Sequence, residues 1–310
     1  MYRRILVPLD GSPFGEHALP TAMALAGRMG AQLHLATVAL PATPEMSDSN
    51  RAVPRGEDAR DRGQARAGQY LEEVQERIRK VGFEGTVGTE VISAGNTAHS
   101  LVRHLVDLEV DLVVMTTHGR GPIQRAWLGS TADGVIRRSP VPVLLLRPEE
   151  DEPVDLSTEP EPFRSVLVPL DGSRTGEELL AMAPPITAED ATITLLRVVA
   201  PFIPGGSPYL PHVVRETHDQ EAVETAAVEY LEGVADRFDL GGRSTEARTS
   251  LQGQAGMAIL EVARTMGADL VAISTAGRGG VARMLLGSVA DKVIRGAPCP
   301  VLVYRKPEEE

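Results

Sequence analysis

The chain has 310 residues, a formal net charge of −12 and a charged fraction of 24%. This length is about twice the commonest domain size, so it predicts two domains. The acidic balance excludes a protein whose main task is to wrap DNA or RNA, because phosphate backbones require clustered Lys and Arg. A small anionic ligand remains compatible, since a few backbone N–H groups can dominate the local field.

Cysteine use and hydropathy indicate the compartment. Cys299 is the single cysteine, which excludes an intrachain disulfide and favours a reducing environment. The N-terminus enters a strand pattern at once without a signal-peptide stretch, and the sequence has no apolar run of about 18 residues that could span a membrane. We therefore expect a cytoplasmic protein with neither a membrane nor a nucleic acid as its partner.

Short apolar runs alternate with longer amphipathic segments in the first half. We expect strands near 4–9, 32–38, 86–92, 111–116 and 142–146, and helices near 14–29, 57–81, 97–108 and 130–138. Runs without alternation, such as Leu112 to Met115, suit strands covered on both faces. This pattern predicts a doubly wound α/β domain whose ligand lies beyond the carboxyl ends of the strands. Asp10, Val38 and Thr116 fall at or just past such ends, so we expect them to meet in one cleft.

A repeat sets the architecture. The segment ILVPLDGS at 5–12 returns as VLVPLDGS at 166–173, and PVPVL at 140–144 returns as PCPVL at 298–302. Between the halves, Arg147 to Pro162 is rich in Glu, Asp and Pro, which is typical of an extended linker. We therefore expect domain 1 at 1–147, a linker at 148–163 and domain 2 at 164–310. Each domain is predicted to hold a five-stranded parallel sheet with helices on both faces.

A glycine-containing loop follows the fourth strand of each half. In the first half Gly119 and Arg120 belong to this loop, and Gly129 precedes a helix that Ser130 opens. Gly277, Arg278, Gly287 and Ser288 hold the same places in the second half. Glycines let the main chain approach a phosphate closely, and the helix start adds N–H donors and the positive end of its dipole. The arginines can neutralise phosphate charge, or they can pair with nearby acidic side chains.

Structural explanations compete with a phosphate site. Ser130 to Asp133 and Ser288 to Asp291 both fit the S-x-x-[DE] capping box, which stabilises a helix start without any ligand. Asp133 would also oppose an incoming phosphate. Asp10 and its counterpart Asp171 can simply cap the Asp-Gly-Ser turn that they begin.

The chain resembles the universal stress protein family in its tandem two-domain form, over nearly all of both halves. The signature that carries the resemblance is G-x2-G-x9-G-[ST]. Gly119, Gly129 and Ser130 match it in the first half, and Gly277, Gly287 and Ser288 match it in the second. Thr116 and Ser274 stand where its first glycine belongs. The resemblance implies a Rossmann-like, adenine nucleotide alpha-hydrolase-like fold.

The resemblance also implies site residues and a cofactor. Asp10 and Asp171 would contact the ligand, Val38 and Val198 would line an adenine pocket, and Met115 and Ile273 would lie against the sugar. Thr131 and Val289, which follow the signature serines, complete the candidate set. The cofactor would be ATP, with Mg²⁺ carried by its phosphates. A Cβ at Thr116 or Ser274 is harmful if that position requires a positive φ and harmless if φ is ordinary.

Three functions follow from these features. The leading hypothesis is an ATP-binding stress-response protein in which occupancy is a signal or a stabiliser. The first alternative is an interaction module that keeps the fold without binding nucleotide, which Thr116 and Ser274 favour. The second alternative is a slow ATPase. The sequence argues against it, because it has neither a G-x4-G-K-[ST] motif nor any catalytic constellation.

Family resemblance further implies dimers formed through the last strand. In a fused chain, residues 141–145 of one half would meet 300–304 of the other as an intrachain pseudo-dimer. The alternative is that both segments are inner strands of their own sheets, and a homodimer of the fused chain is a separate option.

Overall fold

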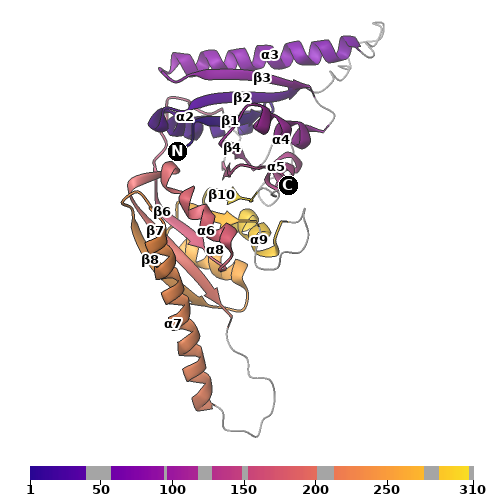
Figure 1. The fold of residues 1–310 in the computed structure, drawn as a ribbon. Helices are drawn as coiled ribbons and strands as arrows, with labels where there is room; N and C mark the ends of the chain where they lie inside the picture. The colour runs from indigo at the N-terminus through magenta and orange to yellow at the C-terminus, as the bar shows by residue number, and fades with distance from the viewer. Residues whose placement is uncertain are drawn as a thin grey trace. The chain divides into compact units, whose positions relative to one another are not determined.

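The structure is a computed structural model that describes residues 1–39, 57–93, 96–117, 128–148, 153–200, 213–275 and 286–306. It divides into two compact units, of which unit 1 contains Met1–Glu161 and unit 2 contains Pro162–Lys306. Each unit is an α/β domain built on a parallel sheet (Figure 1).

The sheet of unit 1 has the strand order β3-β2-β1-β4-β5. Its strands are β1 (Arg4–Leu9), β2 (Gln32–Ala39), β3 (Val87–Ser93), β4 (Leu112–Thr116) and β5 (Val143–Leu146). The chain first winds outward from β1 to β3 and then returns to add β4 on the other side of β1. The direction of winding therefore reverses between β1 and β4. Every residue of β4 is buried, as predicted for a strand covered on both faces.

The helices of unit 1 follow from this winding. They are α1 (Pro13–Glu16), α2 (Ala18–Met29), α3 (Glu57–Lys80), α4 (Thr97–Asp107) and α5 (Ser130–Ile136). Right-handed crossovers place α2 and α3 on one face of the sheet and α4 and α5 on the other. The single helix expected at 14–29 is wrong in one respect, since it breaks at His17. Pro20 supplies the reason, because it has no N–H to donate to the Glu16 carbonyl.

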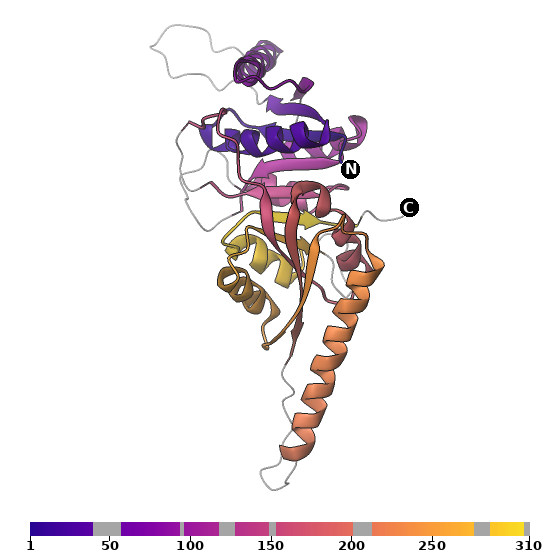
Figure 2. The same cartoon turned by 90° about the vertical axis from the view of Figure 1, so that its left-hand side faces the viewer.

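Unit 2 has the equivalent strand order β10-β9-β6-β7-β8. Its strands are β6 (Phe163–Pro169), β7 (Thr187–Val199), β8 (Ser244–Leu251), β9 (Leu270–Ser274) and β10 (Val301–Tyr304). The longer helices are α7 (Val213–Arg237), α8 (Ala255–Thr265) and α9 (Ser288–Gly296). Figure 2 shows α7 on one side of this sheet and α8 and α9 on the opposite side. β5 and β10 are each the outermost strand of their unit's own sheet, so the alternative of inner strands is wrong.

One helix differs between the units. Where unit 1 has α2, unit 2 has only the short helix α6 (Arg174–Glu178) and two 3₁₀ turns, η1 (Leu179–Ala181) and η2 (Pro184–Ile186). α6 has already ended at Glu178, and Pro184 and Pro185 then prevent a helix from continuing through this segment, because neither can donate a backbone hydrogen bond. The chain after them joins the sheet instead, so β7 has 13 residues and its register with β6 shifts between Phe163 and Ser165.

An aspartate that recurs in both units accepts hydrogen bonds from backbone amides at the start of the first strand. Asp111 Oδ2 accepts hydrogen bonds from the backbone N–H groups of Arg3 (2.7 Å) and Arg4 (2.9 Å). Asp269 accepts from Arg164 and Ser165 in the same way, at 2.7 Å and 3.0 Å. The repetition of Asp-Leu-Val in the sequence therefore has a structural explanation, since this side chain satisfies two amides that begin the first strand.

Helices α4 and α5 of unit 1 pack closely, and so do the equivalent helices α8 and α9 of unit 2. The glycine at the contact lies on the second helix of the pair in unit 1 and on the first in unit 2. In unit 1, a Cβ added to Gly134 of α5 would lie 2.5 Å from the Cβ of Ala98 in α4. In unit 2 the equivalent positions hold Lys292 in α9 and Gly256 in α8. A Cβ on Gly256 would lie 2.8 Å from Cδ of Lys292. Each unit therefore keeps one glycine at this crossing.

The expected linker is partly ordered. Asp155 Oδ1 accepts hydrogen bonds from the backbone N–H (2.9 Å) and hydroxyl (2.7 Å) of Ser157, which forms a local turn. β6 begins at Phe163, the last residue of the expected linker. Within the described ranges, no helix is both long and apolar enough to cross a membrane.

Candidate functional site

The predicted site residues meet at the carboxyl edge of each sheet, where the winding reverses. In unit 1, Leu9 pairs with Thr37, so Asp10 and Val38 follow side by side. Strand β4 flanks β1 on the other side and ends at Thr116. In open α/β sheets this reversal point is the usual position of a ligand.

Unit 2 gives the convergence in distances. A Cβ placed on Gly176 would lie 3.2 Å from Ser173 Oγ, 3.5 Å from Asp171 Oδ1 and 3.7 Å from Ser274 Oγ. Asp171 and Val198 each lie two residues beyond the paired Pro169 and Leu196. The ends of β6, β7 and β9 therefore come together at one edge, as those of β1, β2 and β4 do in unit 1.

Each aspartate also organises its own turn. Asp10 Oδ1 accepts hydrogen bonds from the backbone N–H (3.0 Å) and the hydroxyl (2.6 Å) of Ser12. Ser12 Oγ in turn accepts from the backbone N–H of Gly15 at 3.1 Å and caps α1. Asp171 accepts from Ser173 N–H at 2.9 Å. The turn-capping interpretation of both aspartates is therefore confirmed, and the turn holds each carboxylate at the edge of the sheet.

Thr116 and Ser274 occupy ordinary strand conformations. They are the last residues of β4 and β9, and the next amide of each strand still bonds to its neighbour, Thr117 N–H to Leu146 O at 3.0 Å and Thr275 N–H to Tyr304 O at 2.9 Å. Among the described residues, Glu109 is the only non-glycine with positive φ. The missing signature glycine therefore introduces no backbone strain at either position.

A backbone hydrogen bond joins the residue after each of these strands to the residue that precedes the next helix. Gly129 N–H donates to Thr117 O at 2.8 Å, and Gly287 N–H donates to Thr275 O at 3.3 Å. Both glycines have extended backbone, with φ/ψ of −60°/150° and −57°/144°, which any residue can adopt. A Cβ on Gly287 would however approach Thr275 O to 3.0 Å. Close approach of two backbone segments, and not an unusual φ, is thus what favours glycine at 287.

The capping-box alternative is wrong in both units. Gly129 and Gly287 are the N-cap residues, neither cap has a side-chain hydrogen bond, and Ser130 and Ser288 occupy the first helical position. Asp133, which the box would turn towards the helix start, instead accepts two hydrogen bonds from Arg137 at 2.7 Å and 2.9 Å.

In unit 2, Asp291 accepts from Arg295 Nε at 2.9 Å in the same arrangement. The carboxylate expected to oppose a phosphate is therefore paired with a cation four residues further along the helix. Both signature serines are exposed at the start of their helices.

The remaining candidates lie as follows. Met115 and Ile273 are each 5% exposed, and Val38, Val198 and Thr131 are half-buried, whereas Val289 is exposed. Gly119, Arg120, Gly277 and Arg278 lie outside the described residues. The described parts of the chain contain no group of three or more His, Cys, Asp or Glu side chains that could hold a metal ion.

Sequence reasoning missed a polar cluster beside each site. In unit 1, the Glu16 carboxylate accepts from Tyr70 Oη at 3.0 Å and from Arg77 Nη1 at 2.7 Å. In unit 2, Glu177 accepts from Tyr230 Oη at 2.9 Å and from Arg237 Nη2 at 2.8 Å. The signal was present as a second repeat, since D-G-S-x-x-G-E occurs at 10–16 and 171–177, and Y-L-E-x-V-x-x-R at 70–77 and 230–237.

The surroundings of both tyrosines raise their pKa. Burial is the main cause that raises the pKa of Tyr70, and the Glu16 carboxylate and Asp10 raise it further. Burial, followed by the hydrogen bond to Glu177, raises the pKa of Tyr230 to about 12, with a smaller contribution from Asp171. In each unit the aspartate at the carboxyl edge of the sheet therefore contributes to the raised pKa of the tyrosine.

Comparison with known proteins identifies the family. The Universal stress protein family matches residues 1–147 and again 162–305. The chain belongs to the universal stress protein family. Among universal stress proteins, Mb2019 of Mycobacterium bovis is 27% identical over 321 aligned residues, which cover 98% of this chain and 96% of that protein.

A shorter relative matches about half of the chain, and a solved structure matches nearly all of it. Universal stress protein MJ0531 of Methanocaldococcus jannaschii is 32% identical over 151 residues, 48% of this chain and 85% of that protein. The crystal structure of a universal stress protein from Archaeoglobus fulgidus matches with a TM-score of 0.63 and 21% identity, covering 98% of both chains. The tandem arrangement of two such domains is therefore shared over full length.

Proposed function

We propose that each unit of this universal stress protein binds ATP at the carboxyl edge of its sheet, with Mg²⁺ carried by the phosphates, and that occupancy serves as a signal or a stabiliser in a stress response. The observation that carries the proposal is the convergence in unit 2 of Asp171, Ser173 and Ser274 around Gly176, at the reversal point of the winding. The same elements meet in unit 1.

The residues at this edge suit an adenine nucleotide. Val38 and Val198 offer half-buried apolar surface next to an aspartate, which fits a base and its polar edge. The hydrogen bond from Gly287 to Thr275 holds Ser288 and the first amides of the nine-residue helix α9 near the end of β9, where a phosphate chain would lie. The pairing of Asp133 and Asp291 with arginines removes an electrostatic objection to bound phosphate.

An interaction module without nucleotide is the second candidate, because Asp10 and Asp171 already serve their own turns. A negative charge placed at the start of the helix distinguishes the nucleotide-binding function from the interaction module. Glu at the first helical position stabilises a helix through its dipole, yet it repels phosphate. Ser130→Glu and Ser288→Glu should therefore keep the fold and remove one binding site each.

The measurement is titration calorimetry with MgATP on the full chain. We expect two sites in the wild type, one in each Glu variant, and two in the matched controls Ser130→Gln and Ser288→Gln. Ligand at a hundred times Kd should stabilise the native state by about 2.7 kcal/mol. If no heat is released and millimolar MgATP leaves the Tm unchanged, the interaction module is the correct function. Phosphate release above background would instead indicate a slow ATPase.

A further inference from the structure

We propose that the clusters Glu16–Tyr70–Arg77 and Glu177–Tyr230–Arg237, here called the turn anchors, are positioning networks that fix the Asp10 and Asp171 turns of the two sites. The inference rests on the proposed function in so far as these turns contact a ligand. Tyr70, Arg77 and their counterparts would act through Glu16 and Glu177, without touching the ligand themselves.

The path from each turn anchor to its aspartate is short. Glu16 directly follows Gly15, and a Cβ on Gly15 would stand 2.9 Å from Asp10 Oδ1. The Gly15 amide is also bonded to Ser12 Oγ, whose hydroxyl donates to that same carboxylate oxygen. A movement of Glu16 is therefore transmitted through one residue to the hydrogen bonds that orient Asp10.

The anchored helices α1 and α6 are too short to be stable without support from the rest of the unit. α1 has four residues and α6 has five, far below the length at which an isolated helix is stable in water. The partner helices α3 and α7 have 24 and 25 residues. Leu71 and Val74 of α3, and Leu231 and Val234 of α7, are at most 1% exposed. The buried apolar residues of α3 and α7 thus hold each long helix in place. The turn anchor then connects the short helix, α1 or α6, to the long one.

Hydrogen bonds hold the Glu16 carboxylate at both of its oxygens. Glu16 is 7% exposed, and a buried carboxylate is stable only when its oxygens have partners. Tyr70 and Arg77 are seven residues apart, two helical turns, so both reach Glu16 from one side of α3 and each bonds a different oxygen. Two donors at two oxygens fix the orientation of the carboxylate as well as its position.

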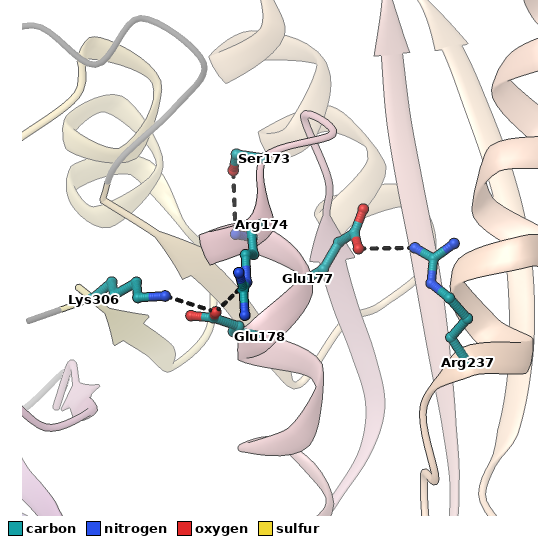
Figure 3. A network of polar contacts seen from close by, with 7 residues as sticks. Ser173, Arg174, Glu177, Glu178, Arg237 and Lys306 are labelled. Atoms are coloured by element: carbon teal, nitrogen blue, oxygen red, sulfur yellow. Dashed lines mark hydrogen bonds and ion pairs between the residues drawn. The ribbon is translucent and has the colours of Figure 1, made fainter.

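In unit 2, which lacks a counterpart of α2, a second acidic residue of α6 also forms ion pairs. Glu178 accepts from Lys306 Nζ at 2.9 Å and from Arg174 Nε at 3.1 Å. Figure 3 shows α6 with Glu177 turned towards Arg237 and Glu178 towards Lys306. Unit 1 has His17 at the position of Glu178, but there α2 continues the chain and packs on β1. The anchor itself is the part that both units share.

The test uses backbone amide exchange, because it reads the turn without any ligand. Tyr70→Phe removes one donor from Glu16 and keeps the ring. We expect exchange at the Ser12 and Gly15 amides to become about tenfold faster, while the amides of Ser173 and Gly176 in unit 2 stay unchanged. Tyr230→Phe should give the opposite pattern. Glu72→Gln, an exposed change on α3, is the matched control and should alter neither.

MgATP titration of the same variants tests the consequence. We expect Tyr70→Phe to weaken one of the two sites about tenfold and to leave the other at its wild-type Kd. Unchanged exchange at Ser12 and Gly15, or acceleration spread evenly along α3, would refute the positioning role. If wild type binds no nucleotide while Tyr70→Phe still releases the turn, the proposed function fails and the positioning role stands.

Discussion

Gly134 marks the tightest approach of two helices in unit 1, and replacing it by Ala gives a prediction whose sign is informative. In an unconstrained helix interior, Gly→Ala stabilises by about 1 kcal/mol. Here the new methyl would lie 2.5 Å from the Ala98 Cβ, whereas non-bonded carbons prefer about 3.5–4.0 Å. Helices α4 and α5 must therefore separate by about 1 Å, and overpacking of this kind costs about 1–3 kcal/mol. We expect a net loss of stability of up to about 2 kcal/mol, where the unconstrained exchange would give a gain.

The arrangement in unit 2 supplies the rescue. Gly134→Ala combined with Ala98→Gly moves the small residue to the other helix, as Lys292 and Gly256 have it. Ala98→Gly alone should lower stability by about 1 kcal/mol through helix propensity. The double variant should return close to wild type, which gives a coupling energy of about 2 kcal/mol between the two positions.

The assay is denaturant unfolding of the full chain, followed by fluorescence of Trp127, the single tryptophan, which belongs to unit 1. Gly27→Ala in α2 is the matched control, because its Cβ would have nothing within 4 Å and should stabilise. A Gly134→Ala variant that is as stabilised as Gly27→Ala, or a double variant whose effects simply add, would refute the close crossing of α4 and α5.

Two further predictions concern the tyrosines and the replaced signature glycine. Because the pKa of Tyr230 is raised from 10.0 to about 12 in the folded state, its contribution to stability is complete below pH 10 and is lost as the pH rises towards 12. Denaturant unfolding between pH 10 and 12 should show the free energy of unfolding falling with pH, and Tyr230→Phe should make this fall less steep. An equally steep fall in the variant would contradict the raised pKa of Tyr230. Thr116→Gly should lower stability by about 1–2 kcal/mol, because glycine weakens a strand. Calorimetry should find its MgATP affinity within about twofold of wild type, whereas a tenfold gain would show that the threonine side chain obstructs the ligand.

The sheets could be predicted well because buried strands and their order leave a strong local pattern. All five strands and the later helices of the first half begin and end within a few residues of their predicted positions. The break at His17 and the loss of a full helix after Glu178 were missed, although Pro20, Pro184 and Pro185 were visible in the sequence. These prolines act through absent hydrogen bonds, which hydrophobic periodicity does not register.

The site was harder to predict, because its details depend on contacts between distant segments. The position of Asp10 followed from the strand pattern alone. The role of Ser130 did not, since S-x-x-D fits a capping box equally well, and only the bond from Asp133 N–H to Gly129 O assigns the cap to the glycine. The partners of Glu16 lie 54 and 61 residues away, so no local rule links them.

The opposite placement of the small residue at the two helix crossings has a consequence for how a duplicated chain folds. Two similar halves joined by a short segment can exchange equivalent helices during folding, a characteristic failure of tandem repeats. If α9 docked on α4, Lys292 would meet the Ala98 methyl where its own unit has Gly256. If α5 docked on α8, Gly134 would face Gly256 and leave the crossing underfilled. We therefore expect each helix to pack best in its own half, so that this pair of positions favours docking within the correct repeat.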